Sequence, residues 1–124
     1  MAELKLFDLE IYKLSHYLGN KCWELSSNWK DFEKSTLGRQ LVRAADSVSL
    51  NFCEGYGRFH FNDRKMFCYY CRGSLYETIE CLKKARDRKL INETEYMEVS
   101  KLVELLGIKL NNFIKSLKAN TLSP

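Results

Sequence analysis

Proline is absent from the first 123 residues of the chain, because its one proline is Pro124. A proline inside a helix removes a backbone hydrogen bond and clashes with the preceding turn, so a chain without proline can form long unbroken helices. Glycine is also sparse, with six residues in the whole chain. A β-sandwich of this size would need more turn residues. The sequence therefore predicts an all-α fold.

Four segments carry apolar residues at steps of three and four positions, which is the spacing of one face of an α-helix. The predicted helices span about residues 8–26, 36–54, 63–89 and 93–118. The last segment has the most regular pattern, which includes Val99, Val103, Leu106 and Leu110. A length of 124 residues suits one domain. We therefore expect residues 1–124 to form a single antiparallel, up-down-up-down four-helix bundle with short connections.

Several residues at the ends of these segments are typical of helix caps. Asp8 and Asn62 can act as N-caps of the first and third helices, because their side chains accept hydrogen bonds from free backbone N–H groups. Asn92 and Glu95 have the spacing of a capping box before the fourth helix. Gly55 is placed to stop the second helix, since glycine reaches left-handed backbone angles at little cost.

The composition argues against a membrane or secreted protein. Hydrophobic residues make up 45% of the chain and charged residues 29%, a normal globular balance. No apolar run approaches the roughly 18–20 residues that span a bilayer, and the N-terminus lacks the pattern of a signal peptide. We expect a cytoplasmic protein without a membrane partner. Its five cysteines should then be reduced thiols, and their odd number argues against a complete disulfide framework.

Positive charge is concentrated between residues 58 and 89, which hold nine basic and four acidic side chains, a net charge of +5 within a chain of +4. Such a segment can attract phosphate groups and predicts a nucleic-acid-binding surface. The alternative is an ordinary solvated helix face whose basic last turn suits the helix dipole. The candidate nucleic-acid-binding residues are Arg58, Arg64, Lys65, Arg72, Lys83, Lys84, Arg86, Arg88 and Lys89.

The sequence contains no clear motif for catalysis or metal binding. The chain has two histidines, and they lack the spacing of a metalloprotease; no glycine-rich phosphate loop is present. Cys68 and Cys71 form a CxxC pair that could bind zinc with Cys53 or His60, but buried free thiols are the favoured interpretation. A carboxylate-bridged metal pair would need Glu-x-x-His elements, which do not occur. We therefore expect no enzyme activity, no cofactor and no metal.

A polar stripe runs along one face of the second predicted helix. Its members recur at steps of four and three: Arg43, Ser47, Asn51 and Glu54. If this face is buried, its groups need partners, and a network with Ser74 and Glu77 of the third helix, including an Arg43–Glu77 pair, would supply them. The alternative is a solvated face. Gly73, in the middle of the third helix, costs about 1 kcal/mol relative to alanine, and we expect close packing of a neighbouring helix there rather than ligand contact.

The stretch from Gln40 to Arg58 resembles the hallmark motif of the four-helix bundle proteins encoded by 23S ribosomal RNA intervening sequences. The motif residues in this chain are Gln40, Arg43, Ser47, Asn51, Glu54 and Gly55, with Gly73, Ser74 and Glu77 as a second motif. Cys53 stands where alanine is usual, and Gly38 where threonine or serine is common. The resemblance covers nearly the whole chain and implies a bundle that assembles as a ring-shaped homopentamer.

Related accessory proteins of diversity-generating retroelements are similar bundles, which bind nucleic acid and a partner reverse transcriptase through a basic surface. The resemblance therefore implies an accessory protein that binds RNA or DNA, with a reverse transcriptase as a candidate partner. The alternative is a protein–protein interaction scaffold that binds no nucleic acid. Because a fold does not determine a function, the basic surface itself has to support this choice.

Overall fold

The computed structural model describes residues 2–120, and the side chains of residues 5–117. Within this range the secondary structure is entirely helical, without strands. This confirms the predicted all-α fold with four long helices. The elements are a 3-10 helix at Ala2–Asp8, α1 at Glu10–Ser27, α2 at Asp31–Glu33, a π-helix at Lys34–Gly38, α3 at Arg39–Tyr56, α4 at Phe61–Asp87 and α5 at Glu93–Asn120. Met1 and residues 121–124, which include the proline, lie outside the described residues.

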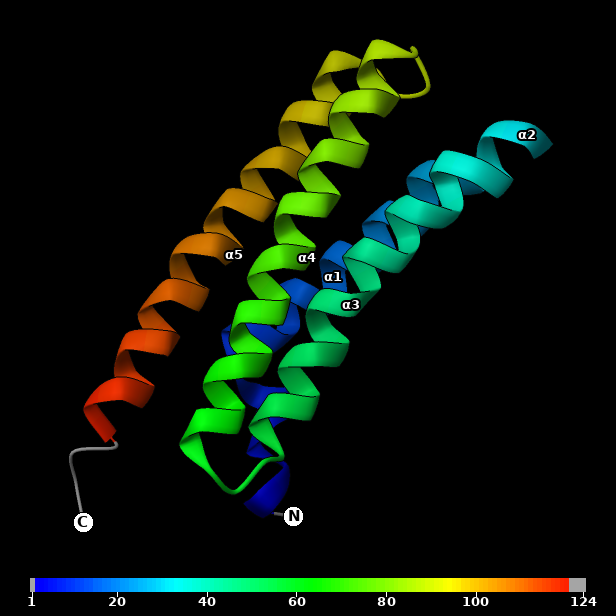
Figure 1. Cartoon of the computed structure of the whole chain (residues 1–124). Coiled ribbons are helices and arrows are strands. Elements are labelled where there is room, and N and C mark those ends of the chain that lie inside the picture. The colour runs from blue at the N-terminus through cyan, green and yellow to red at the C-terminus, as the bar shows by residue number, and fades with distance from the viewer. Residues whose placement is uncertain (1, 121–124) are drawn as a thin grey trace.

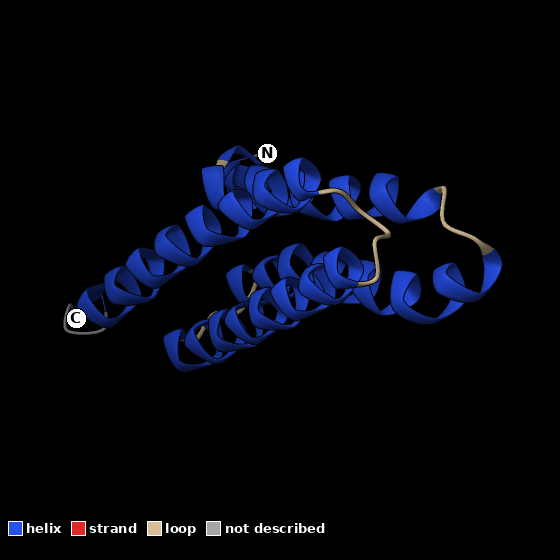
Figure 2. Cartoon of the chain, turned by 90° about the horizontal axis from the view of Figure 1, so that it is seen from above, coloured by secondary structure: helices blue, strands red, loops and turns tan. Residues whose placement is uncertain are grey.

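The long helices pack against their neighbours in the sequence. α1 packs against α3, α3 against α4 and α4 against α5, and α5 also contacts α1. Figure 1 shows α3 and α4 joined at one end of the molecule and diverging toward the end that carries α2. Figure 2 shows that the loops are confined to short connections. None of the described helices is both long enough and apolar enough to cross a bilayer.

Each long helix contributes large side chains to one core. Leu18 of α1, Leu41 and Phe52 of α3, Leu82 of α4 and Leu106 of α5 are almost completely buried. Burying a side chain of this size contributes about 1.5–3 kcal/mol relative to leaving it exposed. The three-and-four spacing of the apolar residues therefore corresponds to the faces that meet in the bundle.

The second helical region begins earlier than predicted. Only residues 28–30 are non-helical between α1 and α2, and the chain is then helical from Asp31 to Tyr56. Acidic Asp31 and Glu33 lie in the first turn, where they interact favourably with the positive end of the helix dipole. Gly38 is buried beside Trp29, so close that an added Cβ would lie 3.4 Å from the indole Cε3 atom.

Two predicted N-caps are wrong. Asp8 belongs to the 3-10 helix, and the N-cap of α1 is Leu9, which has extended backbone angles and no side-chain capping bond. Asn62 lies inside α4, whose N-cap is His60. Both helices start without a side-chain cap, because burial of their apolar faces can fix a helix start without one.

The predicted role of Gly55 as a helix stop is also wrong, since α3 continues to Tyr56 and no glycine has a positive φ. Gly55 is instead a point of close approach between helices, because an added Cβ would lie 2.6 Å from the Cβ of Phe67 in α4. α4 ends at Asp87, two residues before the predicted end, and Lys89 takes the left-handed conformation with a φ of 62°.

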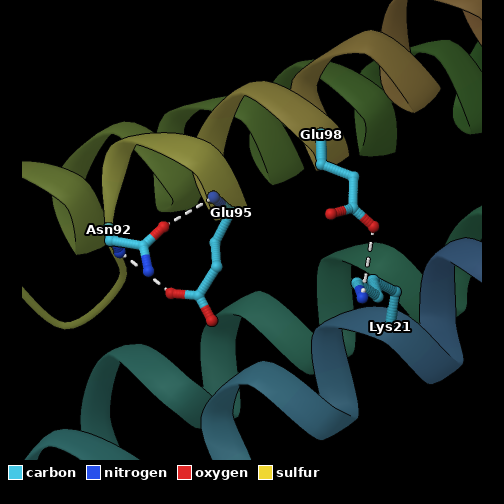
Figure 3. Close-up of polar contacts among 4 residues, drawn as sticks. All are labelled: Lys21, Asn92, Glu95 and Glu98. Carbon is cyan, nitrogen blue, oxygen red and sulfur yellow. Dashed lines mark hydrogen bonds and ion pairs between the residues drawn. The ribbon is translucent and has the colours of Figure 1, made fainter.

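The predicted capping box before α5 is confirmed (Figure 3). The Glu95 N–H donates to Oδ1 of Asn92 at 2.8 Å, and the Asn92 N–H donates to Oε1 of Glu95 at 2.9 Å. Lys21 of α1 lies 3.3 Å from Oε1 of Glu98, so an ion pair links α1 to the first half of α5. The start of α5 is therefore fixed both locally and by a neighbouring helix.

Replacing Asn92 with alanine is expected to lower the free energy of unfolding by about 1 kcal/mol, because the Glu95 N–H loses its acceptor. Urea denaturation followed by far-UV circular dichroism measures this change. Thr94→Ala, at an exposed position of the same turn, is the control and should change stability by less than about 0.5 kcal/mol. Equal midpoints for wild type and Asn92→Ala would show that the cap does not stabilise the fold.

Candidate nucleic-acid interface

The structure separates the nine predicted binding residues into two groups, one on the turn before α4 and the first half of that helix, the other at its end. We call Arg58, Arg64, Lys65 and Arg72 the corner cluster. Arg58 lies in the turn between α3 and α4, Arg64 and Lys65 lie near the start of α4, and Arg72 lies two helical turns further along it. The far cluster, at the α4–α5 turn, comprises Lys83, Lys84, Arg86, Arg88 and Lys89. Arg64 and Arg86 are about 33 Å apart along the helix, from a rise of about 1.5 Å per residue. One basic segment of the sequence thus forms two surfaces.

Two arginines of the corner cluster are held against aromatic rings. The Cζ atom of Arg64 lies 5.4 Å from the centroid of the Tyr56 ring, and Cζ of Arg58 lies 5.1 Å from that of Phe67. Nε of Arg64 donates to the backbone oxygen of Arg58 at 2.7 Å, and Glu54 pairs with Arg58 at 3.3 Å. Because these contacts orient the guanidinium groups in advance, binding an anion costs less side-chain entropy.

The other two cations of the corner cluster share one tyrosine. Nζ of Lys65 lies 5.8 Å from the centroid of the Tyr69 ring, and Cζ of Arg72 lies 4.9 Å from it. Arg72 also donates from Nη1 to Oδ1 of Asn111 in α5 at 3.3 Å. Phe59, in the turn itself, is 92% exposed. Positive charge and aromatic surface therefore alternate over this corner of the bundle.

Acidic neighbours and ring contacts occupy part of the far cluster. Lys84 lies 3.7 Å from Glu80, and Arg86 lies 3.5 Å from Asp87 while its Cζ stacks 4.1 Å from the centroid of the Tyr96 ring. Residues 73–89 hold five basic and three acidic side chains, whereas residues 58–72 hold four basic and one acidic. Once Glu54, the ion-pair partner of Arg58, is counted with residues 58–72, the two clusters have the same net charge of +2. The corner cluster differs in having more aromatic partners.

The polar stripe of α3 forms only part of the predicted network. Oγ of Ser47 donates to Oγ of Ser74 at 2.6 Å, which joins α3 to α4 as expected. Nδ2 of Asn51 donates to the backbone oxygen of Ser47 at 2.8 Å. The predicted buried pair of Arg43 with Glu77 is wrong, because both side chains are exposed and no ion pair joins them. The divergence of α3 from α4 toward this end leaves these two side chains in solvent.

Gly73 does not mark close packing within the chain. No atom outside its own helix backbone in the described structure lies within 4 Å of a Cβ added there, and the residue is exposed. The prediction of a helix–helix approach at this position is therefore wrong. The approach occurs at Gly55, where the sequence indicated a helix stop.

No disulfide joins any two of the five cysteines. Four of them are buried and Cys53 is half-buried. Burial raises the pKa of Cys68 to about 11 and that of Cys22 to about 12, so both stay protonated near neutral pH and act as small apolar groups. No three His, Cys, Asp or Glu side chains gather as metal ligands anywhere in the part of the chain that the structure describes.

The chain matches a known protein family. The model of the family described as 23S rRNA-intervening sequence protein matches residues 7–112. The chain belongs to this family. The matched range contains all of the corner cluster and the far cluster.

A solved structure also resembles this chain. It is the crystal structure of a protein of unknown function from the S23 ribosomal protein family of Bacteroides thetaiotaomicron, with a TM-score of 0.77 and 15% sequence identity. The match covers 85% of the present chain and 98% of the other. At this identity the likeness shows a shared fold alone. No curated protein sequence matches the chain significantly.

Sequence reasoning missed two residues that the structure brings to candidate binding surfaces. Asn111 holds Arg72 from a different helix, and nothing local in the sequence indicates that contact. Arg39 lies one helical turn before Arg43, and both line a cleft between α3 and α4. Its spacing of four residues from Arg43 is a signal that could have identified it.

Proposed function

We propose that this protein is a non-catalytic accessory protein that binds RNA or DNA through the corner cluster. The observation that carries the proposal is the pre-oriented set of four cations, each placed over an aromatic ring within 6 Å of its centroid. Cations of this kind contact phosphates, and exposed aromatic side chains stack on unpaired bases. A cytoplasmic setting, as predicted from the sequence, is part of the proposal.

The expected mode of binding follows from these groups. Phosphate contacts carry no sequence information, and every base presents a flat face to an aromatic ring. Binding should therefore show little sequence preference and should weaken steeply with salt. Phe59, beside Arg58 in the exposed turn, is the side chain best placed to stack on a base.

The proposal includes an up-down-up-down topology and assembly into a ring of identical chains, a pentamer by family resemblance. The order in which neighbouring helices pack supports the topology. Exposed apolar side chains on α5, among them Met97, Leu105 and Ile108, support self-association, because apolar residues are enriched at the core of homo-oligomer interfaces. A ring would repeat the corner cluster around its axis and strengthen binding through avidity. A reverse transcriptase as partner rests on the resemblance alone.

Fluorescence anisotropy with labelled RNA and DNA oligonucleotides at low salt tests the proposal. The variant Arg58→Gln/Arg64→Gln/Lys65→Gln/Arg72→Gln should bind at least tenfold more weakly than wild type, since four phosphate contacts are removed. The matched control is Lys83→Gln/Lys84→Gln/Arg88→Gln/Lys89→Gln, which removes the same charge from the far cluster and should weaken binding less. Absence of binding by the wild type, or equal losses in both variants, would contradict the proposal.

The second candidate function is a protein–protein scaffold, and the exposed Tyr76 and Ile108 favour it. Tyr76 lines a groove between α4 and α5 together with Ile79 and Gly107, and Ile108 is the residue that follows Gly107 in α5. In this case a protein partner should co-purify after nuclease treatment. The variant Arg58→Gln/Arg64→Gln/Lys65→Gln, which leaves Arg72 in the lining of the groove unchanged, should retain that partner.

A further inference from the structure

A cleft of about 510 Å³ lies between the first half of α3 and α4. Its walls include Arg39, Gln40 and Arg43 of α3 and Glu77 of α4. The residues that line the cleft belong to the parts of α3 and α4 that diverge toward α2 in Figure 1. The cleft is distinct from the corner cluster, because Arg43 lies about 20 Å along α3 from Tyr56, where the helix ends before Arg58.

The two arginines of this cleft have no acidic partner. No carboxylate of the described residues lies within 4 Å of the guanidinium nitrogens of Arg39 or Arg43. They are one helical turn apart, so their guanidinium groups can converge on one anion. Glu77 on the opposite wall is the single acidic side chain among the lining residues, which leaves a net positive charge. Paired guanidinium groups of this kind suit the oxygens of a phosphate.

An apolar pocket of about 300 Å³ adjoins the same arginines on the side of α1. It is lined by Trp23, Gly38 and Val42 together with Arg39 and Arg43. Trp23 is 64% exposed, so much of its indole is open to solvent. An open indole beside an apolar hollow can stack on a planar base. A phosphate site and a base site thus share one pair of arginines.

The backbone beside both hollows is irregular. Lys34–Gly38 forms a π-helix between α2 and α3. Thr36 of this segment lines the cleft, and Lys34 and Gly38 line the apolar pocket. π-helical turns are rare and often occur at functional sites. This feature is independent of the charges and indicates the same place.

We propose that the cleft and the adjoining pocket together bind a nucleotide, with its phosphate on Arg39 and Arg43 and its base against Trp23. The shared ligand chemistry is a phosphate monoester on a nucleoside, which either a free mononucleotide or the 5′-phosphorylated end of a strand presents. This site does not depend on binding at the corner cluster.

The chain contains its own reporter for this site. Its two tryptophans are Trp23, which lines the apolar pocket, and Trp29, which packs beside Gly38. A base stacked on Trp23 should quench the intrinsic fluorescence. Titration with adenosine monophosphate should therefore lower tryptophan emission in a saturable way. Adenosine, followed by its own quenching, and inorganic phosphate, followed by its competition with adenosine monophosphate, each lack half of the ligand and should bind at least tenfold more weakly.

Arg39→Gln/Arg43→Gln should weaken nucleotide binding at least tenfold, whereas Arg64→Gln/Arg72→Gln, in the corner cluster, should leave it unchanged. All four side chains lie at the surface or are only partly buried, and circular dichroism confirms that each variant is folded. Quenching by a 5′-phosphorylated oligonucleotide but not by adenosine monophosphate would identify a strand end as the ligand. No quenching by either ligand, equal binding of inorganic phosphate, or unchanged affinity of Arg39→Gln/Arg43→Gln would overturn the proposal.

Discussion

Replacing Phe52 with alanine is expected to lower the free energy of unfolding by about 3–5 kcal/mol, the usual cost of removing a buried aromatic ring and leaving a cavity. Phe52 is 2% exposed. Its ring contacts that of Phe113 edge to face, with centroids 5.2 Å apart, and so links α3 to α5. Since small domains have only about 5–15 kcal/mol of stability, this substitution should remove a large part of the total.

Urea denaturation followed by circular dichroism measures the effect of Phe52→Ala. Leu50→Ala is the matched control, because Leu50 lies on the same helix and is 67% exposed. Its replacement should change stability by less than about 1 kcal/mol. If the two variants lost similar stability, the packing of α3 described here would be wrong.

Alanine at Gly55 and alanine at Gly73 are expected to have opposite effects. At Gly55 the new methyl group would collide with Cβ of Phe67, only 2.6 Å away, so α3 and α4 must separate at a cost of about 1–3 kcal/mol. At Gly73 the space is open, and alanine should stabilise α4 by about 0.5–1 kcal/mol because it is the better helix former. The two variants should therefore differ by about 1.5–4 kcal/mol.

Thermal unfolding of the two glycine variants under identical conditions measures this difference. Size-exclusion chromatography of each variant at the same concentration shows whether assembly has changed. A Gly55→Ala variant as stable as wild type would contradict the close approach of α3 to α4. A destabilised Gly73→Ala variant would contradict an open position at Gly73.

The four long helices follow from local features of the sequence. No proline occurs before Pro124, and apolar residues recur at steps of three and four. Both features favour a helix within a single segment, without contacts from the rest of the chain. The capping box at Asn92 and Glu95 is equally local and was predicted correctly. Asp8 and Asn62 carry the same kind of cap signal, yet burial of neighbouring apolar residues sets those helix starts instead.

The roles of the glycines depend on how the helices rotate against one another. In the sequence, Gly55 and Gly73 are equally able to permit a close approach between two helices. Only the packing of α3 on α4 shows that this approach occurs at Gly55. Arg43 and Glu77 fail to pair for a related reason, because α3 and α4 diverge near them. By contrast, the positive charge of the candidate interface could be counted in the sequence. The contacts of these cations with aromatic rings required the structure.

Binding to a single-stranded oligonucleotide, measured over a range of salt concentrations, tests the central claim most directly. The logarithm of the binding constant should fall linearly with the logarithm of the salt concentration, with a slope of about −0.7 per phosphate contact for single strands. Losing all four cations of the corner cluster should therefore make the slope shallower by up to about 3. No binding at low salt, or the same slope in wild type and the corner variant, would contradict a nucleic-acid interface at this corner.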